Sequence, residues 1–195
     1  MGATERNELE RLLFADVMST LPAEKVKVID ESSTHCDMNP LYAWAAKGER
    51  AYAKGKRNYG SNVSLIASLS LNGCGPAFAI EGPVNSAVFA TYVNDLLVPT
   101  LQPGDIVLMD NLSSHKTTAV RQAIEARGAQ LLFFPAYSPD FSPIEQAFSK
   151  IKAILRRIRP PTLSDLYEAL QVAIDQVTNT DALGYFCAAG FLNIR

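Results

Sequence analysis

Several features are scarce in this sequence of 195 residues, and each absence excludes a class of protein. The three cysteines, Cys36, Cys74 and Cys187, are far apart and form no C-x-x-C pair, so neither a disulfide framework nor a zinc-cysteine site is indicated. No apolar run approaches the roughly 20 residues that span a bilayer, and the charged N-terminus does not resemble a signal peptide. We therefore expect a cytoplasmic protein without a membrane segment.

Net charge is also small, but the charges are unevenly distributed. The formal net charge is −2, and apolar residues make up 48% of the chain, which predicts a packed core. Residues 47–57 and 144–159 together hold ten of the 18 basic residues and two of the 20 acidic ones. Such patches either bind phosphates or are solvated basic faces. The candidates for phosphate contact within them are Lys54, Lys56, Arg57, Lys152 and Arg156.

Apolar alternation and continuous apolar runs predict five strands. The first run alternates and ends at Asp30, and the second and third flank Asn72-Gly73, a strong hairpin signal. The last two are apolar throughout and are separated by a helical pattern, as in parallel α/β units. Three antiparallel strands followed by two parallel ones give a mixed five-stranded sheet with helices on both faces. The predicted strands cover residues 25–30, 62–71, 76–81, 105–109 and 130–134.

Helical periodicity and its punctuation predict the helices. An N-terminal helix carries an apolar stripe of leucine and valine, Gly128 ends a middle helix, and Pro143 opens a long one that Pro160 stops. Residues 1–22 are interpreted as an N-terminal helix or linker remnant, and residues 23–195 as one α/β domain. The predicted helices cover residues 5–20, 85–98, 116–127, 143–159 and 162–177, with one further short helix in 181–195.

Acidic residues mark the ends of two of these strands. Asp30 follows the first apolar run and Asp110 follows the fourth. Because sites in open α/β sheets form beyond the carboxyl ends of strands, the two acids would face one crevice if their strands were neighbours. Taken singly, each is also explained as a turn or cap residue after a buried strand.

A third acid, Glu145, lies in the first turn of the helix that Pro143 opens. The helix dipole alone would favour an acid there. However, Lys152 and Arg156 share its helical face, and a carboxylate beside a row of cations suits a metal site next to a phosphate backbone. Three carboxylates without a His or Cys cluster select Mg²⁺ or Mn²⁺ over zinc, and two such ions can clamp the oxygens of a phosphoryl displacement.

Four stretches carry a family resemblance: VIDESS (28–33), WAAKG (44–48), VLMDNLSSHK (107–116) and PAYSPDFSPIEQAFSKIK (135–152). They resemble the insertion-sequence branch of the mariner-like transposases, which belong to the DDE superfamily and have an RNase H-like fold. The resemblance covers roughly residues 20–192, and the 34 residues between Asp110 and Glu145 are typical of the family. It implies that Asp30, Asp110 and Glu145 are the catalytic, metal-binding triad of a DNA transposase catalytic domain.

The resemblance also implies cofactors and partners. These are two Mg²⁺ or Mn²⁺ ions per site, transposon-end and target DNA with a TA dinucleotide target, and a homodimer assembled on DNA at the bacterial nucleoid. Two alternatives remain, namely an RNase H-like nuclease that only hydrolyses and an inactive transposase-derived domain that binds DNA. Full-length members of the family that this chain resembles have a helix-turn-helix region joined to the catalytic domain. Residues 1–22 are too short for such a region.

Several neighbours of the triad have roles that the sequence leaves open. Glu31 follows the first aspartate on a strand and so points the opposite way, which predicts a supporting role. Asn111 and His115 match the family's D-N-x-x-x-H pattern, and His115 either contacts the scissile phosphate or fixes the loop. Asp140 resembles the family's structural acid. Trp44 either stacks on a DNA base or anchors a small hairpin, and packing is the expected role.

Overall fold

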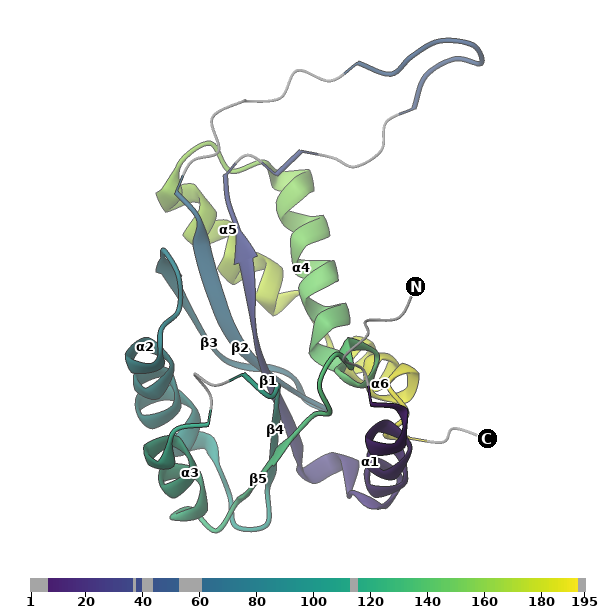
Figure 1. Cartoon of the computed structure of the whole chain (residues 1–195). Coiled ribbons are helices and arrows are strands. Elements are labelled where there is room, and N and C mark those ends of the chain that lie inside the picture. The colour runs from purple at the N-terminus through teal and green to yellow at the C-terminus, as the bar shows by residue number, and fades with distance from the viewer. Residues whose placement is uncertain (1–6, 37, 40–43, 53–60, 113–115, 193–195) are drawn as a thin grey trace.

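The computed structural model describes residues 7–36, 38–39, 44–52, 61–112 and 116–192. A five-stranded sheet lies at its centre in the order β3-β2-β1-β4-β5 (Figure 1). Neighbours β1, β2 and β3 pair antiparallel, whereas β4 and β5 extend the other edge of β1 in parallel, which confirms the predicted mixed sheet. The strands are β1 (Val26–Thr34), β2 (Val63–Ser70), β3 (Gly73–Glu81), β4 (Ile106–Met109) and β5 (Gln130–Phe133).

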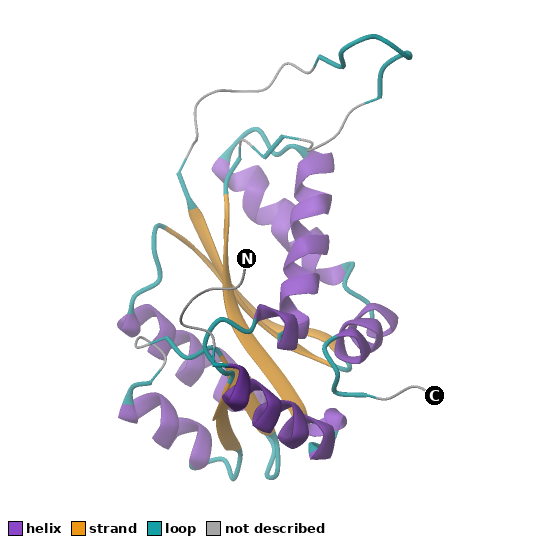
Figure 2. Ribbon diagram, turned by 45° about the vertical axis from the view of Figure 1, so that its right-hand side comes forward, coloured by secondary structure: helices purple, strands orange, loops and turns teal. Residues whose placement is uncertain are grey.

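Helices cover both faces of this sheet (Figures 1 and 2). One face packs against α1, α4, α5 and α6, and the other against α2, η2 and α3. None of the helices in the described part of the chain is long and apolar enough to cross a bilayer. The helices are α1 (Glu8–Thr20), α2 (Ser86–Thr91), the π-helix η2 (Tyr92–Leu97), α3 (Thr118–Glu125), α4 (Pro143–Ile158), α5 (Leu163–Asp175) and α6 (Asn179–Ala188), with 3₁₀ turns η1 (Ala23–Lys25), η3 (Val98–Thr100) and η4 (Pro139–Phe141).

Alternation along the strands divides the apolar side chains between two cores. Val28 and Leu108 face the core with α4, α5 and α6, whereas Ile29 and Met109 face the core with η2 and α3. All four side chains are fully buried. Because side chains alternate between the faces of a strand, a sheet covered on both faces requires apolar residues at successive positions. The run IVLM of β4 meets that requirement.

Two strand boundaries differ from the prediction. β1 does not end at Asp30 but continues to Thr34, because β2 pairs with it as far as the Thr34–Val63 pair. The polar residues after Asp30 carry no apolar alternation, so the sequence alone did not reveal this extension. β3 begins at Gly73, where φ is 95° and an added Cβ would lie 2.9 Å from the carbonyl oxygen of Val177. Only glycine fits that turn without strain.

The N-terminal helix α1 packs through the face opposite its apolar stripe. Arg11 and Met18 are its buried residues, and Met18 belongs to the core formed with α4, α5 and α6. The side chains that predicted the helix are exposed instead. They are Leu9, Leu12, Leu13 and Val17, with exposed fractions of 67%, 69%, 62% and 44%.

The long helices differ in how their first turns are capped. At α5, Thr162 Oγ1 accepts the N–H of Asp165, and the Asp165 carboxylate accepts the N–H of Thr162, which completes a capping box. Helix α6 begins in the same way. Helix α4 begins with the matching pattern Ser142-x-x-Glu145, but among the described residues the hydroxyl oxygen of Ser142 is buried and has no hydrogen-bond partner. The Glu145 side chain is therefore not used to cap its own helix.

This difference predicts that two alanine substitutions change stability by different amounts. Thr162→Ala should lower the free energy of unfolding by about 1 kcal/mol, because it removes a formed cap. Ser142→Ala should leave it within about 0.5 kcal/mol or raise it, because it removes a buried hydroxyl that has no partner. Urea unfolding followed by circular dichroism measures both. A loss in Ser142→Ala as large as that in Thr162→Ala would contradict this account.

Candidate functional site

The parallel pairing of β1 with β4 brings two acids together. The register pairs Val28 with Leu108 and Ile29 with Met109, so Asp30 comes to lie beside Asp110 where β4 ends. Alternation turns both acids toward the face of the sheet that α4 covers, since the preceding residues face the opposite core. The first and fourth strands are therefore neighbours, as the shared crevice required.

The third acid comes from the start of α4. Pro143 occupies the first helical position, where its missing N–H costs nothing. Glu145 is exposed in the first turn, while the opposite stripe of the helix is buried against the sheet. That stripe holds α4 in place and so fixes the side on which Glu145 emerges. It consists of Ile144, Ala147, Phe148, Ile151, Ile154 and Leu155.

One pocket of about 470 Å³ collects all three acids. Asp30, Asp110 and Glu145 line it, together with Glu31 and Asn111, and the loop of residues 134–139 closes its side. No Lys, Arg, His or Cys is among the described residues that line it. A lining whose charged groups are all carboxylates suits a hard divalent cation.

Local hydrogen bonds orient the two aspartates. Asp30 Oδ1 accepts the backbone N–H of Glu31 at 2.7 Å, and Asp110 Oδ1 accepts the N–H of Leu112 at 3.3 Å. Within the described ranges, no three His, Cys, Asp or Glu side chains are gathered closely enough to hold a metal ion. The acids thus border a common pocket without forming a closed ligand cage, and their assignment as a triad stays a prediction.

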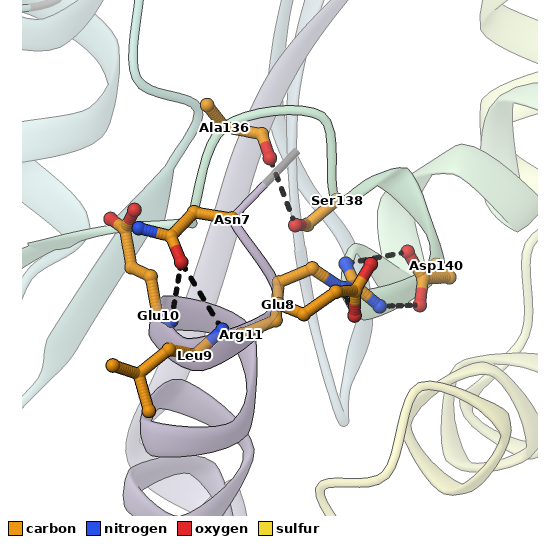
Figure 3. Close-up of polar contacts among 8 residues, drawn as sticks. All are labelled: Asn7, Glu8, Leu9, Glu10, Arg11, Ala136, Ser138 and Asp140. Carbon is orange, nitrogen blue, oxygen red and sulfur yellow. Dashed lines mark hydrogen bonds and ion pairs between the residues drawn. The ribbon is translucent and has the colours of Figure 1, made fainter. Parts of the chain in front are cut away.

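The N-terminal helix holds the loop that leads to Glu145 (Figure 3). Arg11 Nη1 donates to Asp140 Oδ1 at 3.0 Å, and Arg11 Nη2 donates to Asp140 Oδ2 at 2.5 Å. The hydrogen bond to Asp140 raises the pKa of the Arg11 guanidinium, whose carbon also lies 4.3 Å from the centre of the Phe141 ring. Asp140 therefore binds α1 and is not among the residues that line the acid pocket.

Three residues near this pocket have features that no local sequence pattern predicts. Arg11 carries no local signal, because its partner lies 129 positions away. The S-x-x-E pattern of Ser142 predicts an ordinary cap, so its unpartnered hydroxyl appears only in the structure. Tyr137 lines the pocket with φ of 55°, a left-handed backbone that non-glycine residues adopt at a cost of about 1–2 kcal/mol.

The remaining predicted residues have mixed outcomes. Glu31 and Asn111 both line the acid pocket, although strand alternation points Glu31 toward the opposite face of the sheet. Their roles stay predictions. Four further candidates lie outside the described residues. They are His115, Lys54, Lys56 and Arg57.

The loop segment 44–52 stands away from the sheet (Figure 1). It contains a turn at Lys47 and Gly48 and no strand, so the expected hairpin is not seen in this segment. Trp44 has an exposed fraction of 102% and touches no core, so the expected packing role is wrong. The stacking alternative for Trp44 stays a prediction.

The basic residues that follow Glu145 on α4 are of two kinds. Lys152 is half-buried beside Ser32, Ser33 and Thr34, so the row runs along the last part of β1, away from the acid pocket. Lys150 instead donates to Asp181 Oδ2 at 2.6 Å, and this bond lowers the pKa of Asp181 to about 2. Lys150 is therefore used to hold α6 against α4.

Comparisons with known proteins bear on this arrangement. A family model described as DDE superfamily endonuclease matches residues 25–167, and no curated protein matches the chain. The Mos1 mariner paired-end complex with Mn has a TM-score of 0.77 and 20% identity over 95% of this chain and 59% of that chain. The Mos1 complex with the left transposon end gives 0.76 and 19% over 97% and 62%. The Mos1 catalytic domain with raltegravir and Mg gives 0.73 and 17% over 97% and 92%.

These likenesses define the fold and the family. At such identities the solved structures show the fold alone, which is the RNase H-like fold predicted from the sequence. The chain spans about 60% of the length of the transposase chains in the two complexes. The family model covers most of the chain and includes all three acids of the pocket. The chain therefore belongs to the DDE superfamily of endonucleases.

Proposed function

We propose that this chain is a DNA transposase catalytic domain that hydrolyses phosphodiesters and transfers strands at transposon ends. The observation that carries the proposal is the single pocket lined by Asp30, Asp110 and Glu145 in a DDE superfamily fold. Similar folds occur in the Mos1 pre-cleavage transpososome and strand transfer complex, which supports the extension from cutting to joining.

The carboxylate lining suits divalent cations, and we propose that it holds two Mg²⁺ or Mn²⁺ ions. Carboxylate oxygens are the ligands that these cations prefer, and the pocket also borders the unpartnered hydroxyl of Ser142. Mos1 complexes with Mn and with Mg are known. Asp30, Asp110 and Glu145 would hold the ions. When bound, such ions lower the pKa of an attacking water or 3′-hydroxyl and stabilise the leaving oxygen.

The protein contributes position and electrostatics to this chemistry. The sheet fixes Asp30 beside Asp110, and α4 carries Glu145, so the seating of α4 on the sheet sets the spacing of the carboxylates. The carboxylates of Asp30, Asp110 and Glu145 around one pocket repel one another, which is unfavourable until cations are bound. Asn111 offers an amide donor at the pocket wall, and Glu31 supports the adjoining aspartate through its backbone N–H.

DNA is the proposed partner, in the form of transposon ends and a target containing a TA dinucleotide. The Mos1 neighbours include a complex with the left transposon end, which supports a DNA partner. Assembly as a homodimer on DNA and a place at the bacterial nucleoid follow from the family resemblance and complete the proposal.

Metal-dependent nicking tests the proposal directly. The wild-type chain should nick DNA in Mg²⁺ or Mn²⁺ and stop when a chelator is added. Asp110→Ala should lower the nicking rate by more than about a hundredfold, because it removes one of the three carboxylates that would hold the ions. Asp95→Asn, an exposed acid on η2, is the matched control and should keep the wild-type rate. Nicking by Asp110→Ala at the wild-type rate would contradict the metal-site assignment.

Two further measurements separate the alternatives. A DNA end with a pre-cut 3′-hydroxyl should be joined to a target duplex by a transposase, whereas an RNase H-like nuclease would only hydrolyse. Calorimetric titration with Mn²⁺ should show binding in the wild type and weaker binding in Asp30→Asn. The absence of any Mn²⁺ binding would favour an inactive DNA-binding domain.

The basic row on α4 makes a prediction about salt. The double variant Lys152→Ala/Arg156→Ala should bind DNA more weakly. The slope of its log binding constant against log salt concentration should be shallower by about 1–2, because fewer phosphate contacts release fewer counterions. Lys150→Ala is the matched control, because Lys150 is paired with Asp181. Its salt slope should equal that of the wild type. An unchanged slope in the double variant would show that the row is only a solvated face.

A further inference from the structure

A second pocket of about 300 Å³ adjoins the acid pocket. Asn111 lines both pockets, so the two lie next to each other. The charged groups of this second pocket are both cations, and none of the described residues that line it is acidic. Its lining consists of Asn111, Lys116, Thr117, Arg121, Leu131 and Phe133.

Phe133 gathers the two cations at one surface. The Lys116 Nζ lies 5.8 Å from the centre of the Phe133 ring, and the Arg121 Cζ lies 5.9 Å from the same centre. A ring face attracts positive charge, so it favours the presence of both cations in the same small space. Arg121 also pairs with Glu125 at 3.1 Å, but both side chains are about half exposed, and such pairs contribute little. A guanidinium carries five N–H donors, so a single pairing of this kind does not use them up.

Electrostatics gives this cationic pocket a role beside an acidic one. A DNA strand in the acid pocket meets the carboxylates of Asp30, Asp110 and Glu145, and no basic side chain is among the described residues that line that pocket. Bound cations would offset the repulsion at the reacting phosphate, and a basic side chain beside the next phosphate along the strand would strengthen binding by releasing counterions. The second pocket offers two such side chains across the shared wall at Asn111.

We propose that this second pocket binds the DNA backbone phosphate next to the reacting one, with Lys116 and Arg121 as its ligands. The inference rests on the proposed function, because it places DNA in the acid pocket. It adds a contact on the α3 side of the sheet, opposite to Lys152 and Arg156 on α4. The strand would then cross the end of β4 with cations on both sides of the carboxylates.

Replacing single phosphates by neutral methylphosphonates tests the assignment. Fluorescence anisotropy would measure equilibrium binding of each such oligonucleotide in Ca²⁺, a divalent cation that takes oxygen ligands. In the wild type, one neutral phosphate adjoining the cleavage position should weaken binding about tenfold. The double variant Lys116→Ala/Arg121→Ala should bind the intact oligonucleotide about tenfold more weakly, and neutralising the same phosphate should then have no further effect.

Two controls keep the test specific. Arg127→Ala removes a cation near the far end of α3, whose Nη2 donates to the Leu101 carbonyl, and it should keep the wild-type methylphosphonate profile. Lys116→Arg retains the charge and should keep the sensitive position. Circular dichroism should show that Lys116→Arg and the double variant Lys116→Ala/Arg121→Ala are folded, since Lys116 is exposed and Arg121 is about half exposed.

The outcomes separate this inference from the proposed function. One outcome is that the double variant loses affinity to the same extent whichever single phosphate is neutralised, while metal-dependent nicking persists. The pocket is then not a phosphate site, and the transposase proposal stands. If the wild type neither binds nor nicks DNA, both are overturned. The site is supported if neutralising that one phosphate weakens binding by the wild type but no longer weakens binding by the double variant.

Discussion

The parallel pairing of β1 with β4 is the constraint on which the site depends. Val28 and Leu108 are buried in one core and Ile29 and Met109 in the other, so the register is fixed from both faces of the sheet. A slip by one residue would exchange the faces of every side chain in β4 and turn Asp110 away from Asp30's side. The relation between the first two acids is therefore a direct result of core packing. No local device at the site is needed to create it.

The third acid depends on a different kind of support. Arg11 binds the loop before Glu145 through Asp140. The Phe14 ring packs against Phe134 and Phe141, with ring centres 5.7 Å and 5.9 Å away. An arginine with only 7% of its surface exposed is unfavourable unless it is paired, so the two-point bond to Asp140 strongly disfavours other positions of the loop. The sheet sets one side of the pocket, and this loop together with α4 sets the other.

Much of the fold was predictable because it depends on local patterns. Strand alternation, the hairpin glycine and the proline that opens α4 are readable in a single sequence, and so are the three acids that line one pocket. What escaped depends on distant partners. The extension of β1 to Thr34 needs β2, the pair of Arg11 with Asp140 joins residues 129 positions apart, and the exposure of Trp44 contradicts what its size suggests. The apolar stripe of α1 misled for the same reason, since the buried side of a helix is chosen by what it meets.

The Arg11–Asp140 pair also shows that the family match and the packed domain begin at different residues of this chain. The family match begins at residue 25, yet Arg11 and Met18, which lie before it, are buried against the domain. Sequence comparison marks where chains remain alike, whereas the physical domain extends to wherever side chains share a core or an ion pair. A chimera joined at the family boundary would replace the guanidinium at Asp140 with water and uncover the core at Met18. A segment outside the family match is thus part of what keeps the matched segment in shape.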